Sequence, residues 1–196
     1  MPVTSRDPEL GPPVIGIVGW KGSGKTTLTV RLVEHFVRRG LRVSTVKHAH
    51  HDVEIDTAGT DSVRHRGAGA QQVAVVSPAR WAVIKELSGA PEPRLAEVIA
   101  ALDPCDLVIV EGYKTAAFPK IELRRSAAPA HQPLANGDTW VVAVAADHRT
   151  EAASLPVFSL DDIGGIADFI ERTARPLEPR CSSAQSRESG STSGAK

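Results

Sequence analysis

The chain is predicted to fold as one α/β domain, in which helices flank a mainly parallel β-sheet in three layers. Three observations favour this class. Short apolar runs rich in β-branched residues alternate with segments of helical periodicity. A glycine-rich turn joins the first apolar run to the first helical segment, and a later apolar run ends at a glutamate followed by glycine. Such alternation is typical of parallel sheets whose right-handed crossovers place helices on both faces.

The first part of the chain supplies the glycine-rich turn and the elements on either side of it. The run Val14–Gly19 is apolar and β-branched, which is typical of a buried strand. Residues 25–39 follow with apolar side chains on one helical face, and Gly40 is suited to end that helix. Residues 41–48 are expected to form the second strand. A short capped helix is expected from residue 60 or 61 to about residue 66.

The remainder continues the same alternation. The further strands are expected at residues 71–78, 80–87, 105–113, 119–125, 139–147 and 156–160, and the further helices at residues 92–104 and 161–174. The strand PKIELRR, residues 119–125, alternates polar and apolar side chains, so it is expected to be amphipathic.

Composition excludes several classes of protein. The chain of 196 residues is long enough for one domain with a substantial core. Its 23 Lys and Arg balance 23 Asp and Glu, which does not match the basic face of a nucleic-acid-binding protein. Cys105 and Cys181 stand far apart without a CxxC pair, which favours a reducing cytoplasm over a disulfide framework. Because no run approaches the ~18 apolar residues of a membrane span, no membrane partner is expected.

Both ends of the chain are expected to be disordered. Residues 1–13 are polar and proline-rich, and residues 175–196 are rich in Ser and Gly. Such segments bury too little apolar surface to offset the entropy lost on ordering. The folded domain is therefore expected to span residues 14–174.

The glycine-rich turn carries the first functional motif. GWKGSGKT, from Gly19 to Thr26, matches G-x-x-x-x-G-K-[ST], whose backbone N–H groups surround phosphates at a helix N-terminus. Lys25 is expected to contact the β- and γ-phosphates, Thr26 to bind Mg²⁺, and Thr27 to lie near the α-phosphate. A chance glycine-rich turn is the alternative. The position of the motif between a buried strand and a patterned helix instead predicts the P-loop NTPase fold.

A phosphate loop needs a carboxylate at the end of a neighbouring strand, which holds Mg²⁺ directly or through water. Glu111 follows the run LVIV and meets this requirement, whereas Asp106 stands at the other end of the same strand. A solvated strand-end glutamate is the alternative. The identity of the nucleotide base is harder to assign, because the sequence lacks the [NT]KxD motif with which most GTPases recognise guanine. Asp147 ends a late apolar run and is a candidate to pair with guanine, although an ordinary loop aspartate fits equally well.

The stretch KHAHHDVEIDTAGTDS follows the second strand and permits three interpretations. As a zinc site it is poor, because His48, His50 and His51 are adjacent or nearly so and no cysteine is close. As a GTPase switch it is also imperfect, because the segment before the D-x-x-G motif is too short for a long buried strand. We favour a loop that faces the γ-phosphate and Mg²⁺. Asp52 and Asp56 are then candidates to position water, and Asp56 also to bind the metal.

Several segments together carry a specific resemblance. GWKGSGKTTL, VKHAHHDVEIDTAGTDS, RWAV, LVIVEGYK and KIELRR occur in the order and approximate spacing of the MobB family. The sequence resembles these molybdopterin-guanine dinucleotide biosynthesis adapter proteins over about Val14 to Ala174. The resemblance implies a dimeric protein that binds GTP with Mg²⁺ and hydrolyses GTP slowly at most. It also implies a partner, the molybdenum cofactor guanylyltransferase that joins GMP to molybdopterin.

The motifs and the resemblance together define an expected site. The expected nucleotide-binding residues are Gly19, Lys21, Gly22, Ser23, Gly24, Lys25, Thr26, Thr27, Lys47, His48, Arg80, Gly112, Lys114 and Asp147. The expected metal ligands are Thr26, Glu111 and Asp56, and the expected catalytic residues are Glu111, Asp52 and Asp56. One position departs from related dimeric switch proteins. Trp20 stands where they often carry a signature lysine, so activation across a dimer by that lysine is not expected here.

Two other functions compete with the adapter. A P-loop kinase or ATP-dependent ligase acting on a small acid would need a lid with several arginines, and RWAV and ELRR are too sparse to form one. A nickel-delivery metallochaperone GTPase would use the histidines. It would normally add a cysteine-containing metal motif or a histidine-rich tail, and the sequence contains neither. The resemblance to the MobB family favours the adapter.

Overall fold

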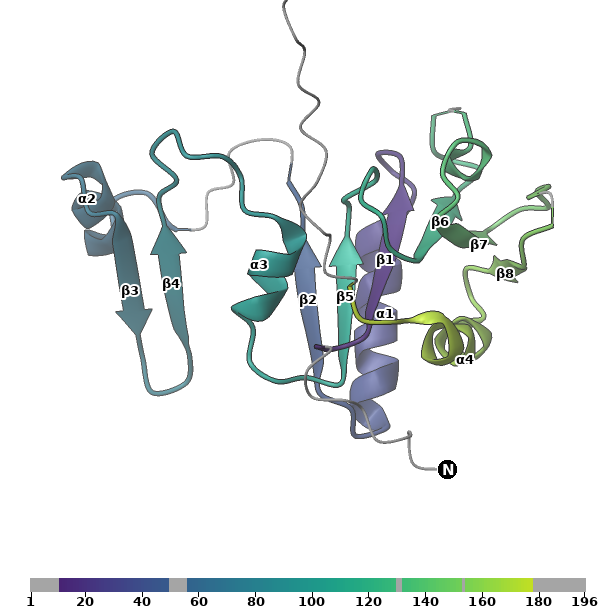
Figure 1. Cartoon of the computed structure of the whole chain (residues 1–196), viewed down its shortest axis with the longest axis horizontal. Coiled ribbons are helices and arrows are strands. Elements are labelled where there is room, and N and C mark those ends of the chain that lie inside the picture. Colours follow the sequence, from purple (N-terminus) through teal and green to yellow (C-terminus); the bar gives the residue numbers. More distant parts are fainter. Residues whose placement is uncertain (1–10, 50–55, 130–131, 153, 178–196) are drawn as a thin grey trace, which may run out of the picture.

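The computed structural model describes residues 11–49, 56–129, 132–152 and 154–177 (Figure 1). The strands are β1 (Val14–Gly19), β2 (Val43–Lys47), β3 (Gln72–Val76), β4 (Trp81–Lys85), β5 (Leu107–Glu111), β6 (Lys120–Arg124), β7 (Val141–Ala146) and β8 (Val157–Ser159). The helices are α1 (Lys25–Arg38), α2 (Asp61–Gly67), α3 (Leu95–Ala100) and α4 (Ile163–Thr173), with one 3₁₀ turn, η1 (Leu134–Asn136). Each strand and helix expected from the sequence is present, and α3 is shorter than expected at both ends. No helix formed by the described residues combines the length and apolar character needed to span a bilayer.

Six strands form one parallel sheet in the order β2-β5-β1-β6-β7-β8. The α/β prediction is therefore confirmed. Because all six strands run in the same direction, their carboxyl ends meet at one edge, which lies at the top of the sheet in Figure 1. The strand β1 lies between β5 and β6, so the segments that follow these three strands converge at this edge. Ligands of parallel sheets bind at such an edge.

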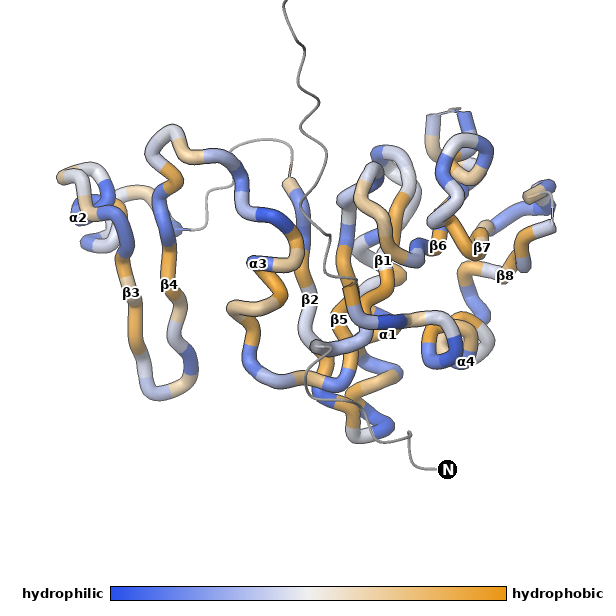
Figure 2. Tube along the Cα trace, viewed as in Figure 1, coloured by the Kyte–Doolittle hydropathy of each residue, from blue (hydrophilic) through white to orange (hydrophobic). Residues whose placement is uncertain are grey.

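Helices cover both faces of the sheet and divide its apolar residues into two layers. One layer joins β1 and β5 to α1 and α4 through residues that include Ile15, Ile17, Leu32, Phe36, Ile109, Ile166 and Ile170. The other joins the same strands to α3 through Val14, Leu95, Ile99, Val108 and Val110. Figure 2 shows the hydrophobic residues concentrated along β1 and β5. Burial on both faces explains why these strands are continuous apolar runs.

The prediction that β6 is amphipathic is wrong, because its polar residues are buried. Lys120 is 0% exposed, and its ammonium donates to the carbonyl oxygens of Lys114 and Ala116, both at 2.7 Å. The same ammonium forms an ion pair with Asp138. Gly16, its neighbour in register on β1, leaves room for it, since a Cβ there would lie 2.5 Å from the Lys120 Cγ. The segments after β5 and before β7 thus cover this face of β6.

Glu122 is the second buried polar residue of β6 and is 1% exposed. Its carboxylate accepts the backbone N–H groups of Leu134 and Ala135 at 2.8 and 3.0 Å. Arg124 donates to it at 2.9 Å and also donates to Thr150. Buried charges are tolerated when they are paired and hydrogen-bonded in this way. The polar alternation of β6 therefore indicates a hydrogen-bonded buried face and not a solvated one.

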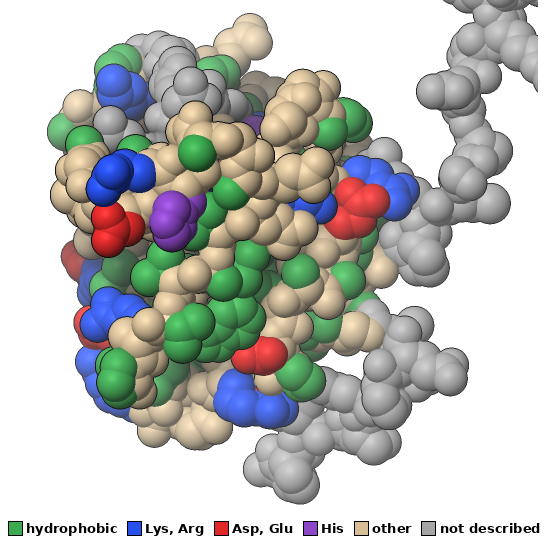
Figure 3. Space-filling model, turned by 90° about the vertical axis from the view of Figure 1, so that its left-hand side faces the viewer, with side chains coloured by type: hydrophobic (Ala, Val, Ile, Leu, Met, Phe, Trp, Pro, Cys, Tyr) green, Lys and Arg blue, Asp and Glu red, His purple; other side chains and the backbone are tan. Residues whose placement is uncertain are grey.

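The hairpin β3–β4 stands apart from the six-stranded sheet and is antiparallel. It carries large apolar side chains that are 40–75% exposed, namely Val75, Val76, Trp81 and Val83, with Leu87 just beyond it. Figure 3, which views the molecule from the side of α2 and β3, shows apolar side chains gathered across that side. A two-stranded hairpin is at best marginally stable in water, so this surface is suited to contact another surface.

The chain continues past α4 along the first strand. The Val14 N–H donates to the Arg175 carbonyl at 2.9 Å, and Leu177 packs against the layer that contains α3. The expected start of the tail, residue 175, therefore lies in a segment that contacts the core. Residues 178–196 lie outside the described residues.

Candidate functional site

The loop between β1 and α1 is built for close approach of an anion. Gly22 and Gly24 have φ angles of +83° and +89°, a left-handed region that favours glycine. Gly24 is also the residue that precedes the first turn of α1, and it has no side-chain cap. The first N–H groups of a helix lack partners within the helix. Because this helix begins at the carboxyl edge of the sheet, its N-terminus and the loop have the geometry of the anion site that the motif predicts.

Thr26 and Glu111 meet at this edge, although 85 residues separate them in the sequence. The Thr26 hydroxyl on the first turn of α1 lies 3.0 and 3.1 Å from the two carboxylate oxygens of Glu111, at the end of β5. Glu111 is 9% exposed. Hydroxyl and carboxylate oxygens are the ligand types that Mg²⁺ prefers. The pair therefore fits the magnesium site expected beside a phosphate loop.

Three lysines lie at the same edge of the sheet as this carboxylate. Lys25 donates to the carbonyl oxygens of Gly19 and Trp20 at 3.0 Å each. Burial lowers the pKa of the Lys25 ammonium; Glu111 opposes the shift, and the positive charges of Lys114 and Lys47 add to it. Lys47 is the register partner of Glu111 on β2. Three ammonium groups against one carboxylate leave an excess of positive charge, which suits a polyanion such as a triphosphate.

Trp20 has a role that the sequence did not predict. The Lys114 ammonium lies 4.1 Å from the centroid of the Trp20 ring, a cation–π contact. The Trp20 indole N–H also donates to the Gln132 carbonyl at 3.0 Å. The Lys120 ammonium donates to the Lys114 backbone carbonyl. The residue that replaces the signature lysine therefore packs against another lysine, which β5 and its following loop bring to the same place.

The turn after β5 links the end of that strand to the histidine stretch. Gly112 and Tyr113 have φ angles of +96° and +51°, and the second is unusual for a bulky residue. The His48 ring stacks on Tyr113 with centroids 4.4 Å apart, and its Nε2 lies 2.9 Å from the Glu92 carboxylate. Burial raises the pKa of Tyr113, and the charge of Glu92 adds to the shift. The His48 backbone N–H donates to the backbone carbonyl of Glu111 at 2.9 Å, so His48 lies beside the candidate magnesium pair.

Asp147 lies at the end of β7, on the same edge of the sheet. Its carboxylate accepts the Ser126 backbone N–H at 2.7 Å and lies 2.9 Å from the His148 Nδ1. The contact with His148 lowers the pKa of Asp147, and the Ser126 N–H adds to the shift. The Arg125 guanidinium lies 3.7 Å from Asp147 and is also close to Gly24. The ends of β6 and β7 therefore lie beside the phosphate loop, where a nucleoside extending from that loop would reach them.

Other expected site residues are not brought to the loop within one chain. Asp56 lies just before α2, where Thr60 donates to it at 3.4 Å. Arg80 lies in the turn between β3 and β4, at the end of the hairpin away from the carboxyl edge of the sheet (Figure 1). Asp52, His50 and His51 lie outside the described residues. Among the residues that the structure does describe, no group of three or more His, Cys, Asp or Glu could hold a metal ion.

A family model for molybdopterin guanine dinucleotide synthesis protein B, MobB, matches residues 14–147. The chain belongs to the MobB family. The matched region runs from the first residue of β1 to Asp147, so it contains the phosphate loop, Glu111 and the whole of β6.

Known relatives and structures agree with this assignment. The Haemophilus influenzae molybdopterin-guanine dinucleotide biosynthesis adapter protein is 39% identical over 162 residues, covering 81% of this chain and 88% of the relative. The Escherichia coli K12 adapter protein is 36% identical over 160 residues, covering 81% and 91%. A crystal structure of molybdopterin-guanine biosynthesis protein B superposes with a TM-score of 0.62 at 30% identity, covering 80% of this chain and 97% of that one. The crystal structure of Bacillus subtilis MobB gives a TM-score of 0.65 at 26% identity, with coverages of 82% and 98%.

Proposed function

We propose that this MobB protein is a GTP-binding adapter for the guanylyltransferase that attaches GMP to molybdopterin, and that it acts as a cytoplasmic homodimer. The contact between Thr26 and Glu111, at the end of a glycine loop and among three lysines, carries the nucleotide-binding part of this proposal. The relatives named as adapter proteins of molybdopterin-guanine dinucleotide biosynthesis support the adapter part. The kinase, ligase and nickel-delivery alternatives lack comparable support.

The residues at the loop fit Mg²⁺ and a triphosphate. Thr26 and Glu111 would hold the metal, which, when bound, neutralises charge on the phosphate oxygens. The N–H groups of the loop and the first turn of α1 would bind the phosphates. Lys25, Lys47 and Lys114 would neutralise the remaining charge. Asp147, beside the loop, would contact the nucleoside.

We expect GTP hydrolysis by the isolated protein to be slow. Rapid hydrolysis needs a group that positions the attacking water and a cation that acts in the transition state. Asp56, one candidate for the first role, lies just before α2 and is not brought to the loop within one chain. No glutamine side chain of the described residues has a hydrogen bond to Thr26 or Glu111. Turnover should therefore fall far below the enzyme median of ~10 s⁻¹.

The proposed homodimer uses the apolar face of the β3–β4 hairpin. A second copy would cover Val76, Trp81 and Val83, which are 49–75% exposed. Val83→Glu should shift the protein toward monomer in sedimentation velocity, because burying an unpaired carboxylate opposes association. Val157→Glu on β8 is the matched control, since Val157 is 45% exposed and lies outside the hairpin. A dimer that survives Val83→Glu unchanged would place the interface elsewhere.

The adapter role is tested by calorimetry and reconstitution. The protein should bind GTP with Mg²⁺ more tightly than ATP, and Lys25→Ala should weaken GTP binding at least tenfold, or ~1.4 kcal/mol, with the fold retained. Adding the protein and GTP to the guanylyltransferase should raise the yield of guanylated cofactor. Phosphorylation of a small-molecule acceptor with no effect on the guanylyltransferase would support the kinase alternative instead.

A further inference from the structure

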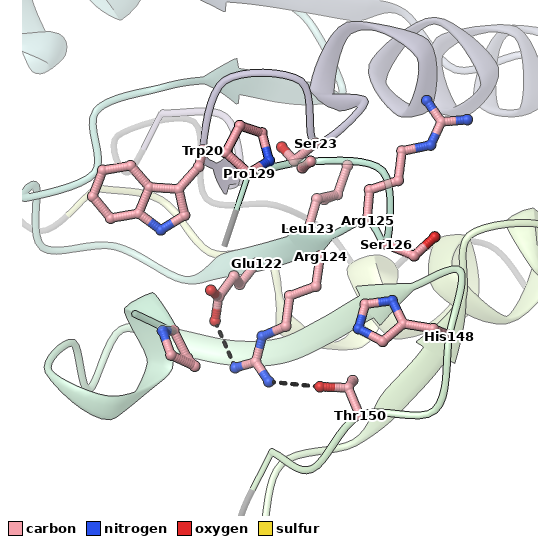
Figure 4. Close-up of a pocket in the computed structure, with 12 residues that line it drawn as sticks. Trp20, Ser23, Glu122, Leu123, Arg124, Arg125, Ser126, Pro129, His148 and Thr150 are labelled. Atoms are coloured by element: carbon pink, nitrogen blue, oxygen red, sulfur yellow. Dashed lines mark hydrogen bonds and ion pairs between the residues drawn. The ribbon is translucent and has the colours of Figure 1, made fainter. Parts of the chain in front are cut away.

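A cavity adjoins the phosphate loop at the end of β6. Its volume is about 310 Å³, enough for a small molecule. Figure 4 shows the side chains that surround it, which come from the loop, the end of β6 and the segments after β6 and β7. The residues that matter for its chemistry are Trp20, Ser23, Glu122, Arg124, Arg125 and His148.

Side chains along β6 point alternately to the two faces of the sheet, and this pattern shows where the cavity lies relative to the candidate magnesium site. Ile121 and Leu123 of β6 belong to the apolar layer that contains α1. Because side chains alternate along a strand, Glu122 and Arg124 point to the opposite face. Glu111 alternates with Val110 of the other layer and therefore lies on the α1 side, where it contacts Thr26. The two sites thus lie on opposite faces of the sheet and meet at the loop.

Two buried polar groups at this cavity could each form one more hydrogen bond. The Ser23 hydroxyl and the Arg124 Nε have no hydrogen-bond partner among the residues that the structure describes. Ser23 is 2% exposed. A buried donor without an acceptor costs free energy, and such groups are rare in native proteins. Two of them at one cavity indicate an occupant that supplies hydrogen-bond acceptors.

The floor of the cavity offers an acceptor next to a donor. A carboxylate has about four acceptor positions. Glu122 accepts three hydrogen bonds, from Arg124 and from the backbone of residues 134 and 135, so acceptor capacity remains. The terminal nitrogens of Arg124 donate to Glu122, Thr150 and the Glu151 carbonyl, so its Nε is the donor that remains for a ligand. An N–H next to a C=O, the edge of a pyrimidinone ring, complements this pair.

The walls and rim narrow the choice of ligand. The indole of Trp20 and the rings of Pro129 and Pro133 give flat apolar walls, which suit a planar ring. Arg125 lies at the rim with its side chain 48% exposed, where it can meet a phosphate. Guanine of GTP and a pterin both carry the pyrimidinone edge. Asp147 lies at the end of β7 for the guanine, whereas Glu122 and Arg124 lie on the opposite face.

We propose that this cavity binds the pterin that receives GMP, a fused pyrimidinone heterocycle with a phosphorylated side chain. This assignment rests on the function proposed above and identifies where the second ligand lies. Bound there, the pterin would share the loop residues Trp20 and Ser23 with the nucleotide. The adapter would then hold nucleotide and acceptor on the two sides of one loop.

The probe is 6-hydroxymethylpterin monophosphate, whose own fluorescence reports binding by polarisation. The full chain should bind it with and without saturating Mg²⁺ and GTP, because the two ligands would lie on opposite faces of the sheet. Ala128→Trp, at the cavity, should weaken binding of the probe at least about tenfold and change GTP affinity by less than about twofold. Ala127→Trp is the matched control: Ala127 is exposed and does not line the cavity, so neither ligand should be affected.

A second variant keeps the test independent of the bulky substitution. Ser23→Ala removes one unpartnered hydroxyl and should weaken the probe about threefold while circular dichroism stays unchanged. Probe binding that persists in Lys25→Ala, when GTP binding is weakened at least tenfold, would support this cavity separately from the nucleotide site. Competition between GTP and the probe, or loss of GTP binding in Ala128→Trp, would make the cavity a guanine pocket and overturn the proposal. Failure of the parent protein to bind the probe at millimolar concentration would also overturn it.

Discussion

Replacing Lys120 by methionine should destabilise the protein and loosen the loop that carries Lys114. Methionine has a similar length, so it can fill the space beside Gly16 without an ammonium group. The substitution removes two hydrogen bonds to carbonyl oxygens and the ion pair with Asp138. Breaking a buried pair on one side typically costs about 3–5 kcal/mol. Because the Asp138 side chain is 23% exposed, water can reach it, and we expect a loss near the lower end, about 3 kcal/mol.

Urea unfolding followed by circular dichroism measures this loss as a lower midpoint at constant slope. Lys85→Met is the matched control, since Lys85 is a strand lysine that is exposed, and it should change stability by less than about 0.5 kcal/mol. A double-mutant cycle with Asp138→Asn should show coupling of at least about 1 kcal/mol between the partners. If Lys120→Met matches Lys85→Met, or if the two substitutions are additive, the buried pair does not stabilise the loop.

Four further predictions concern the site. Thr26→Ala should abolish the Mg²⁺ dependence of GTP binding, whereas Thr26→Ser should preserve it because serine keeps the hydroxyl. If both variants show the same Mg²⁺ dependence of GTP binding, Thr26 does not bind the metal. Lys114→Met should weaken GTP binding about tenfold and flatten its salt dependence. Trp20→Phe, which keeps an aromatic face, should weaken GTP binding less than about threefold, and an effect as large as that of Lys114→Met would contradict the cation–π arrangement. His148→Ala should raise the lowered pKa of Asp147 toward its ordinary value in a ¹³C NMR titration. Asp147 stabilises the folded state at pH values above the ordinary carboxyl pKa, and this stabilisation is lost as pH falls through the lowered pKa. In the His148→Ala variant the stabilisation should be smaller.

The sequence alone determined the fold class and the centre of the candidate site. Apolar runs and helical periodicity are local signals, and they placed each strand and helix because every element here must bury one face or two. The contact between Thr26 and Glu111 was also predictable. A phosphate loop follows a strand, its partner carboxylate ends a neighbouring strand, and parallel strands bring such ends to one edge.

The tertiary structure alone decided what covers β6 and what surrounds Trp20. The alternation in KIELR has the same period whether its polar face meets water or meets other segments of the chain. Only the positions of the loops after β5 and before β7 make Lys120 and Glu122 buried and paired. The contact between Trp20 and Lys114 likewise joins two loops that are distant in the sequence. Burial and pairing depend on contacts between distant segments, and a periodic pattern within one segment carries no information about which segment will cover it.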